Sequence, residues 1–74
     1  MDFGVAVKEI RIKSLLSQSD FARELGVSFS TVNRWEKGKA VPSFKALKKM
    51  KEFCSANNID FNIDAYIQKT YKSE

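Results

Sequence analysis

The sequence has no histidine and only one cysteine, Cys54. A single thiol cannot form an intramolecular disulfide, and alone it cannot build a zinc site. Histidine is the commonest general base, and the sequence also has neither a glycine-rich phosphate loop nor a paired-carboxylate motif. We therefore expect no enzymatic activity, no metal site and no cofactor, and we expect Cys54 to be a small hydrophobic residue of the core.

Long apolar runs are also missing. No stretch of about 20 apolar residues could cross a bilayer, and the N-terminus "MDFGVAVKEI" becomes charged too early for a signal peptide. The lone thiol suits a reducing compartment. The 74 residues are enough for one domain, so we expect a single cytoplasmic domain over residues 1–74 with no membrane partner.

Positive charge is concentrated in the middle of the chain. The net charge is +4, and residues 34–51 contain seven basic residues against one acid, Glu36. The segment 56–74 instead has two basic and three acidic residues. A basic middle indicates a surface that faces a polyanion, although a solvated lysine-rich helix face would give the same pattern.

Apolar spacing and capping residues predict helices throughout the chain. Serines suited to cap helices precede three of them, and Asn62 precedes the last. Gly26 is placed to end one helix in the left-handed conformation, and Pro42 favours an extended loop. The predicted fold is all-α and compact, with five helices, at about 3–14, 18–25, 29–36, 44–55 and 63–71.

The second and third helices are separated by only about three residues, one of which is Gly26. Ala22 is small enough for the two helices to approach closely. So short a connection crosses the helices steeply and does not lay them side by side.

The third helix has a polar side of unusual composition. At about 100° per residue, Val32, Trp35 and Glu36 share the inner side. Ser28 and Phe29 also fall toward that side, and Thr31 lies at the margin. The outer side consists of hydrogen-bond donors with no acid among them: Ser30, Asn33, Arg34 and Lys37. Phe29 lies at the edge, where it either packs against the core or protrudes.

Glu36 is unexpected on an inner side, because a bare buried carboxylate is costly. Arg11 borders the apolar stripe of the first helix, so it is a natural partner. We predict a partly buried Arg11–Glu36 ion pair between the first and third helices; the alternative is two unrelated surface charges.

The stretch "LSQSDFARELGVSFSTVNRWEKGKAVPS" closely resembles the helix-turn-helix of the phage repressor and Cro group, the XRE-type family. The family's unit would begin at Gln18, with the expected small, glycine and apolar positions at Ala22, Gly26, Val32 and Trp35. The resemblance covers about residues 5–55 and implies a lambda-repressor-like fold. The extension at 56–74 departs from the family pattern, and it is either a dimer segment or a packing segment.

The resemblance implies that the third helix lies in the major groove of DNA. The base-reading residues would be Ser28, Phe29, Ser30, Asn33 and Arg34. The phosphate contacts would be Gln18, Lys37 and Lys39. Arg11 and Glu36 match the positions of a buried ion pair in the family. The side-chain chemistry agrees, since Arg34 can bind guanine and Asn33 can bind adenine.

Sequence-specific binding of double-stranded DNA, in transcriptional regulation, is the leading hypothesis for function. One alternative is a DNA-docking module of a larger restriction-modification methyltransferase; another is an antitoxin-like protein-interaction module. A homodimer would suit a palindromic site. Six apolar residues could form its seam or could complete the monomer core: Ile59, Phe61, Ile63, Tyr66, Ile67 and Tyr71.

Overall fold

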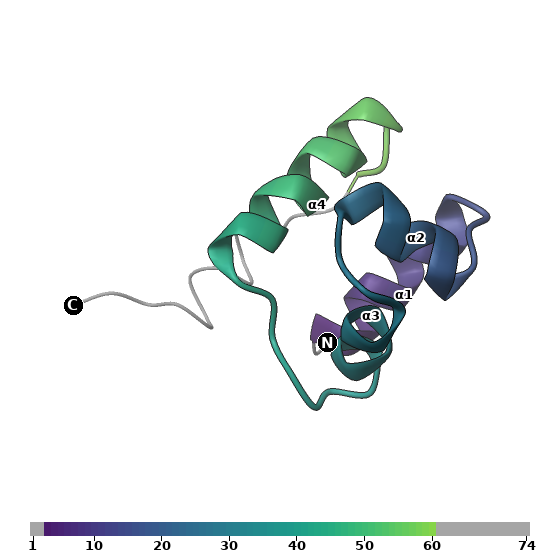
Figure 1. Ribbon diagram of the computed structural model, residues 1–74. Coiled ribbons are helices and arrows are strands. Elements are labelled where there is room, and N and C mark those ends of the chain that lie inside the picture. The colour runs from purple at the N-terminus through teal and green to yellow at the C-terminus, as the bar shows by residue number, and fades with distance from the viewer. Residues whose placement is uncertain (1–2, 61–74) are drawn as a thin grey trace.

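The computed structural model describes residues 3–60, which contain four helices and no strand. These are α1 (Phe3–Lys13), α2 (Gln18–Leu25), α3 (Phe29–Glu36) and α4 (Phe44–Ala56). In Figure 1, α4 runs diagonally above the other helices, and a long loop joins it to α3. The all-α prediction is confirmed for this part of the chain. The fifth helix predicted at 63–71 lies outside the described residues.

Three serines begin the helices as predicted. The side-chain oxygens of Ser17, Ser28 and Ser43 accept hydrogen bonds from the backbone N–H three residues further on. Such caps satisfy donors that have no partner inside the helix. Two boundaries differ by one residue from the prediction: α1 ends at Lys13, because Ser14 and Leu15 already form a turn, and α4 continues to Ala56.

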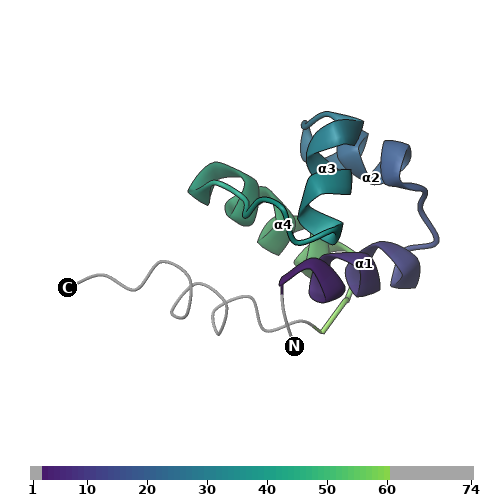
Figure 2. The same ribbon diagram turned by 90° about the horizontal axis from the view of Figure 1, so that it is seen from below.

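Gly26 ends α2 in the left-handed conformation, with φ of 71°. The N–H of Val27 then donates to the carbonyl of Ala22 at 2.9 Å, which closes the turn. Glycine adopts this backbone conformation without steric cost. The chain can therefore reverse within three residues and begin α3 at a steep angle to α2, as Figure 2 shows from below.

The core lies where all four helices meet. Phe21, Ile10, Met50, Val7 and Val32 are its largest fully buried side chains. Phe21 also contacts Phe53 of α4 edge-to-face, with ring centroids 5.4 Å apart. Cys54 is buried in this cluster, as predicted. The close packing fixes α2 against α4 and against α3.

Gly4 allows α1 to contact α3 at the level of the backbone. A Cβ added at Gly4 would lie 2.6 Å from the carbonyl oxygen of Trp35 and 2.8 Å from that of Glu36. These distances are shorter than the contacts that a Cβ atom makes in proteins, so only glycine allows α1 to approach the α3 backbone this closely. The contact positions the end of α3, where Glu36 lies, directly over α1.

The chain turns back to the core after α4. Asn58 is left-handed, with φ of 57°, and the N–H of Ile59 donates to the carbonyl of Cys54 at 2.9 Å. Ile59 then packs against the core cluster. The other five residues considered for a dimer seam (Phe61, Ile63, Tyr66, Ile67 and Tyr71) lie outside the described residues. None of the helices described is long and apolar enough to span a bilayer.

Candidate nucleic-acid interface

α3 packs against α1 and α2 through one side only. In Figure 1 it is seen almost along its axis at the lower edge of the molecule, away from α4. Val32 and Trp35 face inward and are buried, whereas Ser30 and Arg34 are exposed. The helical spacing in the sequence therefore placed these four residues correctly. Ser28 and Phe29, which the spacing turned toward the inner side, are exposed at the start of α3.

The open side of α3 and the turn after it form what we call the donor face: Ser30, Asn33, Arg34, Lys37 and Lys39. Ser30, Arg34 and both lysines are exposed, and Asn33 is half-buried. Within residues 3–60, the charged groups of Arg34, Lys37 and Lys39 have no ion-pair partner. Their hydrogen-bond donors are thus available to an external acceptor.

Two residues at the start of α3 were also predicted to read bases. Phe29 is 51% exposed, so it protrudes at the edge of the donor face. The Ser28 hydroxyl accepts from the N–H of Thr31 at 3.1 Å and lies 2.9 Å from the Thr31 hydroxyl. Ser28 is therefore engaged in capping α3, although it remains exposed.

Arg11 and Glu36 form a forked ion pair across α1 and α3. Arg11 Nε donates to Glu36 Oε2 at 2.7 Å, and Arg11 Nη2 donates to Oε1 at 3.1 Å. The side chains are only 15% and 6% exposed. The hydrogen bond to Glu36 raises the pKa of Arg11 above its ordinary value, and burial opposes this in part. A two-point contact of this kind fixes both distance and orientation.

Arg11 also secures the turn that leads into α2. Its Nη1 donates to the carbonyl oxygen of Leu16 at 3.0 Å. One guanidinium therefore joins α1, the turn after it and α3. Since Glu36 is withdrawn into this contact, its negative charge does not lie on the donor face.

Gln18 links the Arg11–Glu36 ion pair to Asn33 on the donor face. The sequence did not indicate this link. Its Nε2 donates to Glu36 Oε1 at 3.0 Å, while its Oε1 accepts from Asn33 Nδ2 at 3.2 Å. Gln18 was predicted to bind phosphate and Asn33 to bind a base, each independently. The helical wheel placed Asn33 on the outer side of the helix, so the sequence carried no signal of its hydrogen bond to Gln18.

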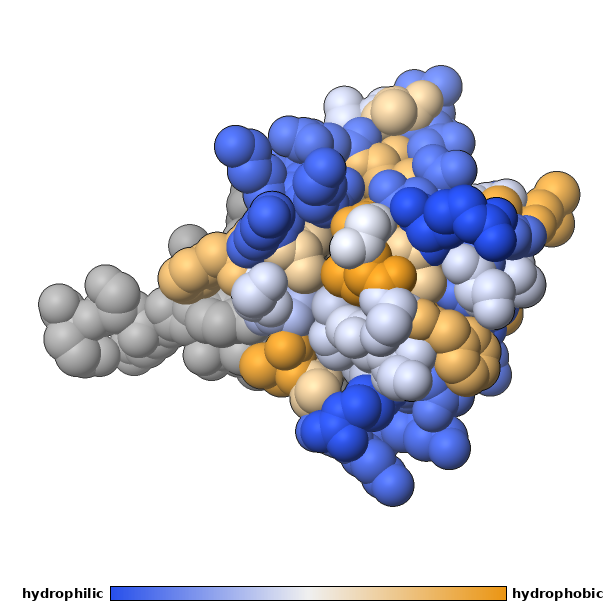
Figure 3. Space-filling view, in the orientation of Figure 1, coloured by the Kyte–Doolittle hydropathy of each residue, from blue (hydrophilic) through white to orange (hydrophobic). Residues whose placement is uncertain are grey.

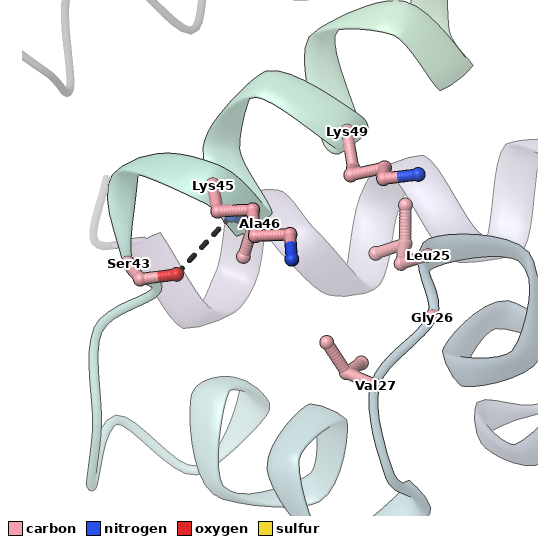
Figure 4. A pocket seen from close by; sticks show the side chains of 7 residues that line it. All are labelled: Leu25, Gly26, Val27, Ser43, Lys45, Ala46 and Lys49. Atoms are coloured by element: carbon pink, nitrogen blue, oxygen red, sulfur yellow. Dashed lines mark hydrogen bonds between the residues drawn. The ribbon is translucent and has the colours of Figure 1, made fainter.

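A separate hollow of about 270 Å³ lies between the α2–α3 turn and the first turns of α4. Figure 4 shows Leu25, Val27 and Ala46 along it and the amino groups of Lys45 and Lys49 beside it. On this face of the molecule, hydrophilic groups surround a more apolar centre (Figure 3). The hollow contains none of the donor-face residues.

Comparison with known proteins agrees with this geometry. A family described as helix-turn-helix matches residues 7–55, which include all of α2, α3 and the turn between them. The chain belongs to this helix-turn-helix family. The resemblance to XRE-type proteins is thereby confirmed, and the chain is a DNA-binding domain of that family.

Two curated helix-turn-helix relatives are similar to this chain. One is the "HTH-type transcriptional activator BcrR" of Enterococcus faecalis, 33% identical over 55 residues, which are 74% of this chain and 27% of the relative. The other is an "Uncharacterized HTH-type transcriptional regulator" of Haemophilus influenzae, 46% identical over 44 residues, which are 60% of this chain and 18% of the relative. The match thus spans about a quarter or less of each relative. No solved structure matches the chain.

Proposed function

We propose that α3 enters the major groove of double-stranded DNA and reads base pairs with its donor face. The observation that carries this proposal is the separation of charge on α3: its only acid, Glu36, is withdrawn into a contact with Arg11. Ser30 and Arg34 meanwhile remain exposed. The outer side of α3 thus offers hydrogen-bond donors to base edges and phosphates, and it presents no negative charge that would repel DNA.

Each residue has a proposed role within this arrangement. Arg34 reads guanine through its forked donors, and Asn33 reads adenine. Ser28, Phe29 and Ser30 contact the neighbouring bases, with Phe29 placed to touch a thymine methyl. Lys37, Lys39 and the remaining N–H of Gln18 bind phosphate, which positions the domain without reading sequence.

We further propose that the domain regulates transcription, because both relatives are named as transcriptional activator or regulator. A single domain of this size covers only half of a symmetric site, so we propose a homodimer. Of the six residues considered for the seam, Ile59 packs against the monomer core. The other five, which lie outside the described residues, are the remaining candidates for the seam: Phe61, Ile63, Tyr66, Ile67 and Tyr71.

Selection of bound sequences from a random duplex pool, at near-physiological salt, tests the proposal. We expect an enriched motif of two inverted half-sites whose centres are about 10 base pairs apart. Failure to enrich any motif would contradict sequence-specific reading. An enriched but asymmetric motif would contradict the dimer and favour the alternative of a DNA-docking module in a larger protein.

A further inference from the structure

Four polar side chains form one continuous hydrogen-bonded chain from α1 to the donor face. Arg11 contacts Glu36, Glu36 accepts from Gln18, and Gln18 accepts from Asn33. The chain begins at a largely buried ion pair and ends at a half-buried residue on the open side of α3. It therefore connects the interior of the domain to a group that faces outward.

The direction of every hydrogen bond in this chain follows from Glu36. An ionised carboxylate can only accept hydrogen bonds, so Gln18 must turn its Nε2 toward it. The Gln18 Oε1 then points the other way, and this oxygen is again only an acceptor. Asn33 must consequently turn its Nδ2 toward Gln18 Oε1, and these two atoms lie 3.2 Å apart.

We propose that Glu36 and Gln18 are positioning residues that fix which way round the Asn33 amide faces DNA, and so which base Asn33 accepts. This inference rests on the proposed function. With one Nδ2 proton committed to Gln18, Asn33 keeps Oδ1 and its second N–H for an external partner. That pair complements the N6–H donor and the N7 acceptor of adenine.

Guanine is rejected by the same arrangement. Its major-groove edge presents two acceptors, N7 and O6, so Asn33 Oδ1 would face another acceptor. Asn33 could accommodate guanine by rotating its amide, but its Oδ1 would then face Gln18 Oε1. Gln18 cannot rotate in response without turning its own oxygen toward the Glu36 carboxylate.

Burial strengthens this constraint. Glu36 is only 6% exposed, so water has little access to replace Gln18 as its donor. Among the described residues, every buried polar side-chain atom has a hydrogen-bond partner. A reversed amide would leave such atoms unsatisfied, which is costly away from water.

The first test uses the free protein. In ¹⁵N-labelled protein, the side-chain amides of Gln18 and Asn33 should give resolved proton pairs with slow hydrogen exchange. Gln18→Met should abolish the protection of the Asn33 amide. Lys8→Ala is the control, because Lys8 is exposed on α1 and takes no part in the hydrogen-bonded chain, so the Asn33 amide should stay protected. An Asn33 amide that exchanges at the rate of an exposed asparagine in the wild type would overturn the inference.

The second test measures base preference. Asn33→Ala first identifies, in the duplex selection, the base pair that Asn33 reads. At that position the wild type should prefer adenine over guanine by about tenfold, as expected for a good two-point contact. Gln18→Met should reduce the preference to within about twofold while the preferences at other positions remain, and Lys8→Ala should retain it.

The outcomes separate the inference from the proposed function. If the wild type selects no motif, the proposed function fails, and the proposed effect on base reading fails as well. Amide exchange in the free protein still reports whether the hydrogen-bonded chain exists. If the wild type selects a motif and Gln18→Met leaves the adenine preference unchanged, the inference fails and the proposed function stands. Thermal melting of each variant confirms that it is folded during these measurements.

Discussion

Gly4 and Trp35 come so close that a Cβ at Gly4 would lie 2.6 Å from the Trp35 carbonyl oxygen. The obstacle is backbone, which cannot move aside like the end of a flexible side chain. We therefore expect Gly4→Ala to lower the free energy of unfolding by about 1–3 kcal/mol, the usual effect of overpacking. This loss should appear even though alanine is the better helix former. Denaturant unfolding provides the measurement.

Lys8→Ala is the matched control for this change, because Lys8 is exposed on the same helix. It should change the unfolding free energy by no more than about 0.5 kcal/mol, as is usual at the surface. A stabilised Gly4→Ala variant would show that α1 does not contact the α3 backbone.

The Arg11–Glu36 pair should behave as a partly buried pair in a double-mutant cycle. Arg11→Met and Glu36→Leu each leave one largely buried charge without its partner, so each should cost about 3 kcal/mol. The double variant leaves neither charge and should be more stable than the less stable single variant. Strictly additive losses would contradict a direct interaction between the two side chains.

We expect Cys54 to make the free energy of unfolding depend on pH in the alkaline range. Burial raises the pKa of the Cys54 thiol above its ordinary value of 9.0. The unfolded chain therefore ionises first, and the stability that is present below about pH 9 is lost as the pH rises through the folded pKa. Arg11 does not contribute to this pH dependence, because its raised pKa places any loss of stability from its deprotonation at still higher pH.

Comparison of the wild type with Cys54→Ala between pH 8 and about 10.5 isolates this effect. The variant lacks the thiol, so its unfolding free energy should fall less steeply with pH, whatever its stability at pH 8. Parallel curves for the two proteins would mean that Cys54 ionises equally in the folded and unfolded states.

The sequence predicted those features of the fold that depend on local chemistry. Ser17, Ser28 and Ser43 cap helices where each serine precedes an apolar repeat, and Gly26 adopts the left-handed conformation that a turn needs. The inward position of Val32 and Trp35 on α3 followed from helical spacing alone. These features involve residues within a few positions of one another, so a single sequence contains the information.

Contacts between distant residues were harder to predict. Gly4 gave no signal, because its role depends on the α3 backbone about thirty residues away. Gln18 and Asn33 were each assigned to DNA, and their mutual hydrogen bond depends on the angle between α2 and α3. Arg11 and Glu36 could be paired in advance only because a carboxylate on an inner helix side requires a partner.

Lys37 is expected to contribute affinity without specificity. Removing one phosphate contact lowers the slope of log K against log salt by about 0.9 for duplex DNA. Lys37→Ala should therefore reduce the magnitude of this slope by about 0.9, which is the contribution of one phosphate contact. It should weaken binding to selected and scrambled duplexes alike. Lys8→Ala on α1 is the control and should leave the slope unchanged. An equal effect of the two variants would remove Lys37 from the interface.

Binding of Arg34→Ala to the selected site and to a scrambled duplex, at one fixed salt concentration, tests the central claim most directly. If α3 lies in the major groove, the selected site should lose about 1–3 kcal/mol of binding free energy, and the scrambled duplex should lose much less. The ratio of the two dissociation constants should then fall by about 5- to 150-fold. Equal losses on both duplexes would show that Arg34 contacts only the DNA backbone and would contradict base reading by the donor face.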